Sequence, residues 1–249
     1  MGMKVWVFTI SFNESYFMPF FLRHYSTFAD KIIVWDEHST DGTRGIVKAC
    51  PKAELRDWPY RGLDDDRFLE AQHNWYKEAR GLADWAMWPD VDELLWHPNM
   101  REVLRDRVEQ RFDRLNARGF ALLPPKPPVD DGHSQFWELA KLGVPTENYD
   151  KSVVLNPGCD IRWDYGRHKV LGFNGRSCPQ TDFRLLHCHF LGLVYTIARN
   201  KRNLDRCINK FYGWNYSKEH DHSGQAGTPS WLRDCYLKKK LINVLECPI

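Results

Sequence analysis

The chain has 249 residues, of which 43% are hydrophobic and 27% are charged. This composition allows one large domain with a buried core and excludes a chain that is disordered throughout. The 35 Lys and Arg residues nearly balance the 33 Asp and Glu residues, giving a net charge of +2. General nucleic-acid binding is therefore not expected. The 11 Trp residues suit either aromatic-lined sugar or base pockets or a large core.

The seven cysteines are an odd number and include no Cys-x-x-Cys pair. This argues against a zinc ribbon or a disulfide framework and for a reducing compartment. The apolar segment from Val5 to Phe12 is too short for a transmembrane helix, and no small-residue cleavage site follows it. We therefore expect a soluble, cytoplasmic protein with at most peripheral membrane contact.

The first third of the chain alternates between strand-like and helix-like segments. Strands are predicted at 4–11, 31–35, 53–58 and 84–89, and helices at 16–28, from about 43 to 49, and at 67–82. This alternation is typical of a parallel sheet with crossover helices, in which ligands bind beyond the carboxyl ends of the strands. Asn13, Asp36 and Asp90 fall at those ends, so we expect them to share a site.

The pattern becomes irregular after about residue 96. Helices are predicted at 99–117, 193–211 and 230–245, strands at 120–123, 151–155 and 183–189, an exposed loop at 124–132 and a linker at 217–228. We predict one domain over residues 1–249. It would comprise a nucleotide-binding half at about 1–96, an acceptor half at 97–210 and a C-terminal helical extension at 211–249.

The most informative segment is Trp85-Ala86-Met87-Trp88-Pro89-Asp90-Val91-Asp92-Glu93, an apolar run that ends in three acids. Asp90 and Asp92 project to the same side if the backbone stays extended. Two carboxylates at a strand end suit Mg²⁺ or Mn²⁺, which leave coordination positions open for the phosphate oxygens of a substrate. A solvated acidic turn is the alternative interpretation.

A second cluster lies late in the chain, in Leu186-His187-Cys188-His189-Phe190, which leads into a basic helix. His187 and His189 share one face of the predicted strand. Neutral imidazole is a good ligand for Mn²⁺ and can complete a carboxylate site. Either histidine could instead be structural.

Several segments, in the same order along the chain, resemble those of family-2-like glycosyltransferases with the GT-A fold. Residues 34–43, Val-Trp-Asp-Glu-His-Ser-Thr-Asp-Gly-Thr, resemble the family's Val-Val-Asp-Asp-Gly-Ser-Thr-Asp-Gly-Thr segment, and Asn13-Glu14 resembles its first nucleotide-contacting loop. Residues 89–95 are similar to the Asp-x-Asp-Glu-Phe element of the branch related to the DUF23 group, 149–154 to its lysine-bearing strand, and 186–190 to its late histidine motif. Glu37 and His38 depart from the Asp and Gly of the family.

The resemblance, over residues 4–210, implies a GT-A-type α/β fold with a Rossmann-like, mostly parallel central sheet, flanking helices and C-terminal helices. It also implies a metal-dependent, inverting glycosyltransferase that moves a sugar from a UDP- or GDP-sugar to a hydroxyl of a glycan or other acceptor. Mn²⁺ or Mg²⁺ would be held by Asp92, Asp90, His189 and His187, with His189 preferred over His187. Nucleotide contacts would come from Asn13, Glu14, Asp36, Asp90 and Lys151.

An inverting displacement needs a carboxylate that takes the proton of the acceptor. Glu138, Asp164 and Asp131 lie in the acceptor half and are the candidates, with Glu138 preferred because it stands beside Trp137. Two other functions stay open. A nucleotidyltransferase would be expected to carry a glycine-rich phosphate loop, which residues 12–15 lack. A non-catalytic module that binds carbohydrate or a partner through its Trp-rich surface would need neither metal nor nucleotide.

Overall fold

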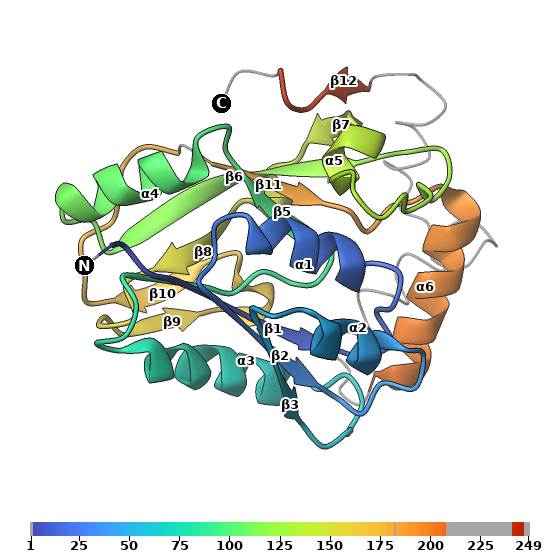
Figure 1. The fold of residues 1–249 in the computed structure, drawn as a ribbon, viewed down its shortest axis with the longest axis horizontal. Helices are drawn as coiled ribbons and strands as arrows, with labels where there is room; N and C mark the ends of the chain where they lie inside the picture. Colours follow the sequence, from blue (N-terminus) through green and yellow to red (C-terminus); the bar gives the residue numbers. More distant parts are fainter. Residues whose placement is uncertain (1, 182, 208–240, 247–249) are drawn as a thin grey trace.

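The computed structural model describes residues 2–181, 183–207 and 241–246. Figure 1 shows a central sheet with helices packed around it. The helices are α1 (Met18–Ser26), α2 (Thr43–Ala49), α3 (Asp65–Asn74), α4 (Met100–Glu109), α5 (Phe136–Leu139) and α6 (Leu193–Arg206), with short 3-10 turns η1 (Trp75–Ala79), η2 (Glu147–Tyr149) and η3 (Tyr165–Arg167).

The strands form one large sheet and one two-stranded ribbon. They are β1 (Val5–Ser11), β2 (Lys31–Asp36), β3 (Ala53–Asp57), β4 (Trp85–Met87), β5 (Glu93–Trp96), β6 (Arg114–Leu122), β7 (Leu142–Pro145), β8 (Lys151–Leu155), β9 (Ile161–Trp163), β10 (Val170–Phe173), β11 (Phe183–His187) and β12 (Ile242–Asn243). Within the described residues the large sheet runs β12-β7-β6-β8-β4-β1-β2-β3, with β11 beside β6 and β5 beside β11, while β9 pairs with β10.

The sheet is parallel where it is built from the first part of the chain. β1 pairs in parallel with β2 and β4, and β2 pairs in parallel with β3. β6 also runs parallel to β11, whereas β8 is antiparallel to both β4 and β6. The α/β class, with a central sheet flanked by helices, is therefore confirmed. Strands β1, β2 and β4 all end at the same edge, and β1 and β2 point toward α6 in Figure 1.

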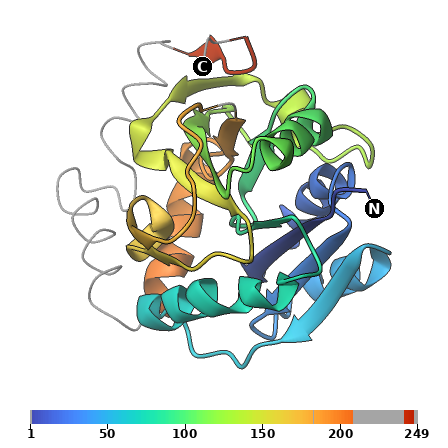
Figure 2. The ribbon, with the colours of Figure 1, turned by 90° about the vertical axis from the view of Figure 1, so that its left-hand side faces the viewer.

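Both faces of the parallel part are buried. Successive strand residues point to opposite sides, and the apolar residues on each side join a separate core. Val5 and Val7 of β1 join a large core that includes residues of α1, α2 and α4. Phe8, the residue after Val7, points to the other face and belongs to a second core with Tyr76 of η1 and Trp163 of β9. Helices α3 and α4 accordingly lie on opposite sides of the sheet in both views (Figures 1 and 2).

The predicted helix at 99–117 is wrong in its second half. Helix α4 ends at Glu109, the chain turns at Arg111 with a φ of 59°, and β6 begins at Arg114. Charged residues at helical spacing suggested a continuing helix, but Leu115 and Ala117 alternate into the core and the strand pairs with β8 and β11. Long-range pairing overrides the local helical propensity here.

Two further predictions differ at their edges. The predicted helix at 67–82 is α3 followed by the 3-10 turn η1. In the predicted helix at 230–245, residues 242–243 form β12, which pairs with β7; residues 230–240 and the predicted linker at 217–228 lie outside the described residues. Among the residues that are described, no helix is both long enough and apolar enough to cross a membrane.

Candidate active site

A cavity of about 470 Å³ lies at the edge of the sheet where β1, β2 and β4 end. This volume suits a small-molecule ligand. Its lining comes from segments far apart in the chain: the ends of β1 and β2, the start of α3, the loop between β4 and β5, η3, the end of β11 and one face of α6. The carboxyl edge of the parallel strands is thus where the structure places a ligand site, as the alternating sequence pattern predicts.

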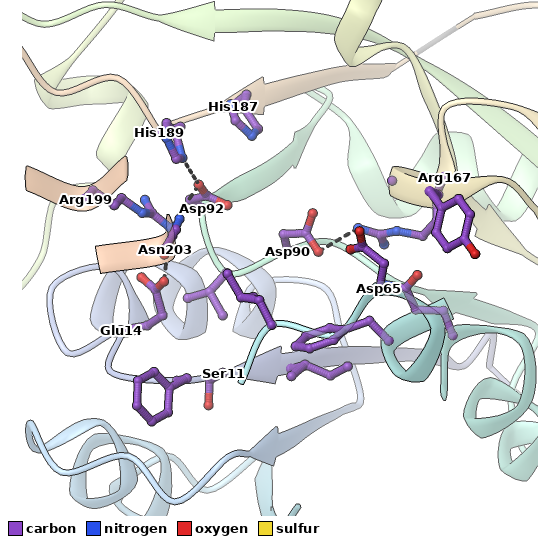
Figure 3. A pocket seen from close by; sticks show the side chains of 18 of the residues that line it. Ser11, Glu14, Asp65, Asp90, Asp92, Arg167, His187, His189, Arg199 and Asn203 are labelled. Carbon is purple, nitrogen blue, oxygen red and sulfur yellow. Dashed lines mark hydrogen bonds and ion pairs between the residues drawn. The ribbon is translucent and has the colours of Figure 1, made fainter. Parts of the chain in front are cut away.

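Asp92 lies in the loop between β4 and β5 and is only 6% exposed. Its Oδ2 atom is 3.3 Å from Nδ1 of His189 and 3.1 Å from Nη2 of Arg199. Burial would raise the pKa of Asp92, but Arg199 and the two histidines outweigh it and hold that pKa well below its usual range. Asp92 is therefore an ionised carboxylate at the wall of the cavity (Figure 3).

His189 joins Asp92 to helix α6. Its Nε2 atom is 2.8 Å from Oδ1 of Asn200. In the tautomer whose Nε2–H donates to that oxygen, Nδ1 faces the carboxylate of Asp92 as an acceptor, whereas in the doubly protonated ring Nδ1–H donates to Asp92. Two acceptors that face each other in this way need a proton or a metal cation between them. The chemistry of this pair therefore fits a divalent ion.

His187 is the second imidazole of the predicted metal set. Its ring stacks on Tyr149, with ring centroids 4.3 Å apart, and burial lowers its pKa to about 3. Its Nδ1 atom is buried and has no hydrogen-bond partner within the described chain. A neutral ring with an unused nitrogen is the form that binds metals. Nevertheless, no group of three or more His, Cys, Asp or Glu residues is placed to hold an ion by itself among the described residues.

Asp90 forms ion pairs with two positive side chains rather than contacting the histidines. Its Oδ1 atom is 2.6 Å from Nη2 of Arg167, and its Oδ2 atom is 3.4 Å from Nζ of Lys151. Lys151 also binds Glu93, whose side chain is fully buried. Glu93 is therefore a buried member of an ion pair and not part of a solvated acidic turn. Direct metal ligation by Asp90 would require these ion pairs to open, whereas Asp92 and His189 face each other across 3.3 Å.

Arg167 is a site residue that the sequence analysis missed. It is 2% exposed, has a φ of 63°, and donates to the backbone oxygen of Trp88 as well as to Asp90. Gly166 precedes it with a φ of 74°, and a Cβ at that position would come within 2.8 Å of the ring of His168. Strained backbone of this kind clusters at functional sites. The Gly-Arg pair in 166–167 was the only sequence signal.

Helix α6 supplies two more positive side chains, which pair with acids in the loops that follow β1, β2 and β4. Arg199 lies 3.0 Å from Oε1 of Glu14, so it links that residue to Asp92. Arg206 lies 3.1 Å from Oε2 of Glu37, which is fully buried and also paired with Arg67. Burial raises the pKa of Glu14 to about 7, although Arg199 opposes this. The sequence indicated a basic helix after the histidines but not these partners.

Asp36 and Asn13, two of the predicted nucleotide contacts, build the loops instead. Asp36 is fully buried and accepts hydrogen bonds from Ser11, from the Ser39 hydroxyl and backbone N–H, and from Arg44. The Oδ1 atom of Asn13 accepts from the backbone N–H of Thr40. Neither is among the described residues that line the cavity, whereas Glu14, Asp90 and Lys151 are.

We expect Asp36→Ala to lower the free energy of unfolding by about 1.5–3 kcal/mol, because the charge-assisted hydrogen bonds to this buried carboxylate are lost. Urea denaturation measures this loss, and Asp36→Asn, which keeps the size and one acceptor, should lose less. Affinity for a nucleoside diphosphate, measured well below the melting temperature, should stay within about threefold. Unchanged stability with more than tenfold weaker nucleotide binding would instead identify Asp36 as a base contact.

The structure does not bring the three predicted catalytic bases to the cavity. Glu138 accepts from the backbone N–H of Gln135 in the capping box of α5. Asp131 accepts from the Ser134 hydroxyl in an exposed loop, and Asp164 accepts from the backbone N–H of Lys169. Each fixes a local turn, and none is among the described lining residues. Asp65, at the start of α3, does line the cavity and was missed because three consecutive acids before a helix look like a cap.

Comparison with known proteins gives no close relative. No family model and no curated protein sequence matches the chain. Among solved structures, S. aureus TarS is 12% identical over 89% of this chain and 44% of its own, with a TM-score of 0.41. Its 1–349 fragment is 10% identical over 95% of this chain and 78% of its own, with a TM-score of 0.45.

A third similar structure is the glucosyl-3-phosphoglycerate synthase from Mycobacterium tuberculosis in complex with Mn²⁺, UDP and glucosyl-3-phosphoglycerate. It is 20% identical over 48% of this chain and 44% of its own, with a TM-score of 0.33. This chain thus spans less than half the length of that synthase and of the first TarS chain.

Proposed function

We propose that this protein transfers a sugar from a nucleoside diphosphate sugar to an acceptor hydroxyl, with inversion at the anomeric carbon and with Mn²⁺ or Mg²⁺ as cofactor. The observation that carries this proposal is the convergence of Asp92, His189 and Arg199 at the carboxyl edge of β1 and β4. A bound diphosphate is neutralised by a divalent ion and by fixed positive side chains. At this end of the cavity Asp92 and His189 could ligate the ion, and Arg199 is a positive side chain.

The roles of the side chains follow from their charges. Asp92 and His189 would hold the ion, and substrate oxygens and water would complete its coordination, as is usual for Mg²⁺ sites with few protein ligands. When bound, the ion would neutralise charge that develops on the leaving diphosphate. Arg199 can turn from its carboxylates to the same phosphate oxygens. Lys151 and Arg167 hold Asp90 in place beside the sugar, where its carboxylate can accept hydrogen bonds from hydroxyl groups.

Isothermal titration of UDP and GDP, with Mn²⁺ and in EDTA, tests the proposal. We expect one of the two nucleotides to bind at least about tenfold more tightly with Mn²⁺, which corresponds to about 1.4 kcal/mol. A screen of nucleotide sugars for release of the nucleoside diphosphate then identifies the donor. Equal binding with and without metal, or binding of free sugars but of neither nucleotide, would contradict the proposal and favour a carbohydrate-binding module.

A nucleotidyltransferase would be recognised by release of pyrophosphate from a nucleoside triphosphate. The loop after β1 argues against it, because Asn13 and Glu14 are fixed by side chains of the next loop rather than arranged as a glycine-rich phosphate cradle.

We further propose a role in glycan or polysaccharide synthesis and a cytoplasmic location. Sugar-nucleotide donors of the two classes, UDP and GDP, are both kept in the screen.

A further inference from the structure

Three consecutive acids at the start of α3 have three different environments. Asp64 caps the helix and accepts from the backbone N–H of Arg67 at 3.3 Å. Asp66 is exposed and accepts the hydroxyl proton of Tyr165. Asp65 between them is 7% exposed and lines the cavity, with its side chain among the pocket residues drawn in Figure 3.

The carboxylate of Asp65 lacks the partners that buried acids normally have. Its Oδ2 atom is buried and makes no hydrogen bond to any described residue. A buried polar atom without a hydrogen-bond partner destabilises the fold, and more so when it is charged, so this arrangement does not serve stability. Asp90, Arg167 and Glu93 show by contrast how the same protein pairs its other buried charges.

Asp65 lies at the opposite end of the cavity from Asp92, His189 and Arg199, where the diphosphate is proposed to bind. In Figure 3, Asp92, His189 and Arg199 lie on one side, Asp65 enters from the side of α3 and η3, and Asp90 lies between them. A sugar whose diphosphate is held at Asp92 would therefore extend past Asp90 toward Asp65. In an inverting displacement the acceptor attacks from the side opposite the leaving group, and with the diphosphate at Asp92 that would be the side on which Figure 3 shows Asp65.

We propose that Asp65 is the general base of the transfer, an inference that rests on the proposed function. The acceptor hydroxyl would donate its proton to the carboxylate of Asp65 while its oxygen bonds to the anomeric carbon. The bond from that carbon to the diphosphate oxygen would break, and its electron pair would leave with the nucleoside diphosphate. An unpaired carboxylate in the cavity wall is the group that such a step needs.

The charge state of Asp65 agrees with this role. Burial, and then the charges of Asp66 and Asp64, raise its pKa to about 7. On the facing elements, burial lowers the pKa of His168 to about 4 and raises the pKa of the Cys207 thiol, so both are neutral near pH 7. A base must be deprotonated to act, so the rate should rise as the pH increases through about 7 and level off above it.

Asp65→Asn tests the inference, with Asp66→Asn as the matched control that removes the same charge one residue away. The assay is release of nucleoside diphosphate from the donor found in the screen, first with water as the acceptor. We expect kcat of Asp65→Asn to fall by about 10²–10⁴-fold, with the affinity for the nucleoside diphosphate unchanged and the acid limb of the pH profile lost. Asp66→Asn should stay within about threefold of the parent and keep that limb, shifted to lower pH because the charge that raises the pKa of Asp65 is removed.

Each other outcome has a definite meaning. If the parent releases nucleoside diphosphate and Asp65→Asn is equally fast, the inference is wrong while the proposed function stands. If Asp65→Asn keeps kcat but binds the nucleotide more than tenfold more weakly, Asp65 is a donor contact and not the base. If the parent acts on no nucleotide sugar, the proposed function fails and the inference fails with it. Melting temperatures establish that both variants are folded.

Discussion

Asp92→Asn should abolish metal-dependent nucleotide binding. Asn keeps the size of the side chain and an oxygen for Arg199, so the fold should survive, but it removes the charge that holds the ion beside His189. Affinity in Mn²⁺ should fall to the value measured in EDTA. Because the ion contributes several kcal/mol to stabilising the leaving diphosphate, turnover should fall by about 10³-fold or more. Full turnover by this variant would refute the metal assignment.

His189→Ala provides the partner measurement for Asp92→Asn. If both residues hold one ion, the double variant should be little slower than either single variant, because groups that act as a unit are strongly non-additive. His187→Ala is the control and should be milder, since its ring stacks on Tyr149, whereas His189 makes the 3.3 Å contact with Asp92. Additive losses in the double variant would show that His189 acts independently of the ion.

Lys151→Met should lower the free energy of unfolding by about 3–5 kcal/mol. Lys151 is 6% exposed, and it pairs with Glu93, which is fully buried. Removal of one member of a buried ion pair leaves the other charge uncompensated, which is the main source of the loss. Arg167, 3.9 Å from Glu93, is too far to replace the lost contact fully. Urea denaturation near pH 7.5 measures the effect.

The pH dependence of this loss has a defined sign. Burial already raises the pKa of Glu93 in the folded protein, and Lys151 opposes that rise. Without the lysine, the folded protein holds a proton on Glu93 more tightly than the unfolded chain does. The stability of Lys151→Met should therefore fall as the pH rises above the ordinary pKa of 4.5 for Glu. The deficit should be smallest near pH 5 and largest above pH 7.

The double variant Lys151→Met with Glu93→Gln separates the two causes of a loss. It removes both charges, so it should recover much of the stability that Lys151→Met loses. Nucleotide affinity should not recover if Lys151 also contacts a phosphate, as the family resemblance implies. A double variant as unstable as Lys151→Met would show that packing around the lysine stem, rather than the charge of Glu93, determines the effect.

The parts of the fold that sequence predicted well are those that depend on local patterns. The strands β1 to β4 and helices α1 to α3 follow from apolar runs and polar turns, and their alternation fixed the carboxyl edge as the place of the site. Strand β6 was largely missed because its first residues are charged and look helical when read alone. Its pairing with β8 and β11 depends on residues that are far away in the sequence.

The candidate site shows the same division. Asp92 and His189 were predicted to meet and do lie within 3.3 Å, since both belong to recognisable motifs at strand ends. Arg199, Arg167 and Asp65 were not predicted, because nothing local distinguishes a buried arginine or an unpaired acid from its solvated neighbours. Glu138, Asp131 and Asp164 each hold a local turn and are not among the described residues that line the cavity, so their catalytic role stays a prediction.

The ion pairs made by Arg199 also affect how the protein folds during its synthesis on the ribosome. One of them joins Glu14, from the end of β1, to a helix 185 residues later in the chain. A ribosome must therefore release all of α6 before the acids at the cavity can be neutralised in this way. Until then the nascent chain carries Glu14 and Asp92 without their arginine, and their mutual repulsion favours an open edge of the sheet. Nucleotide binding should consequently be among the last native properties that the growing chain acquires.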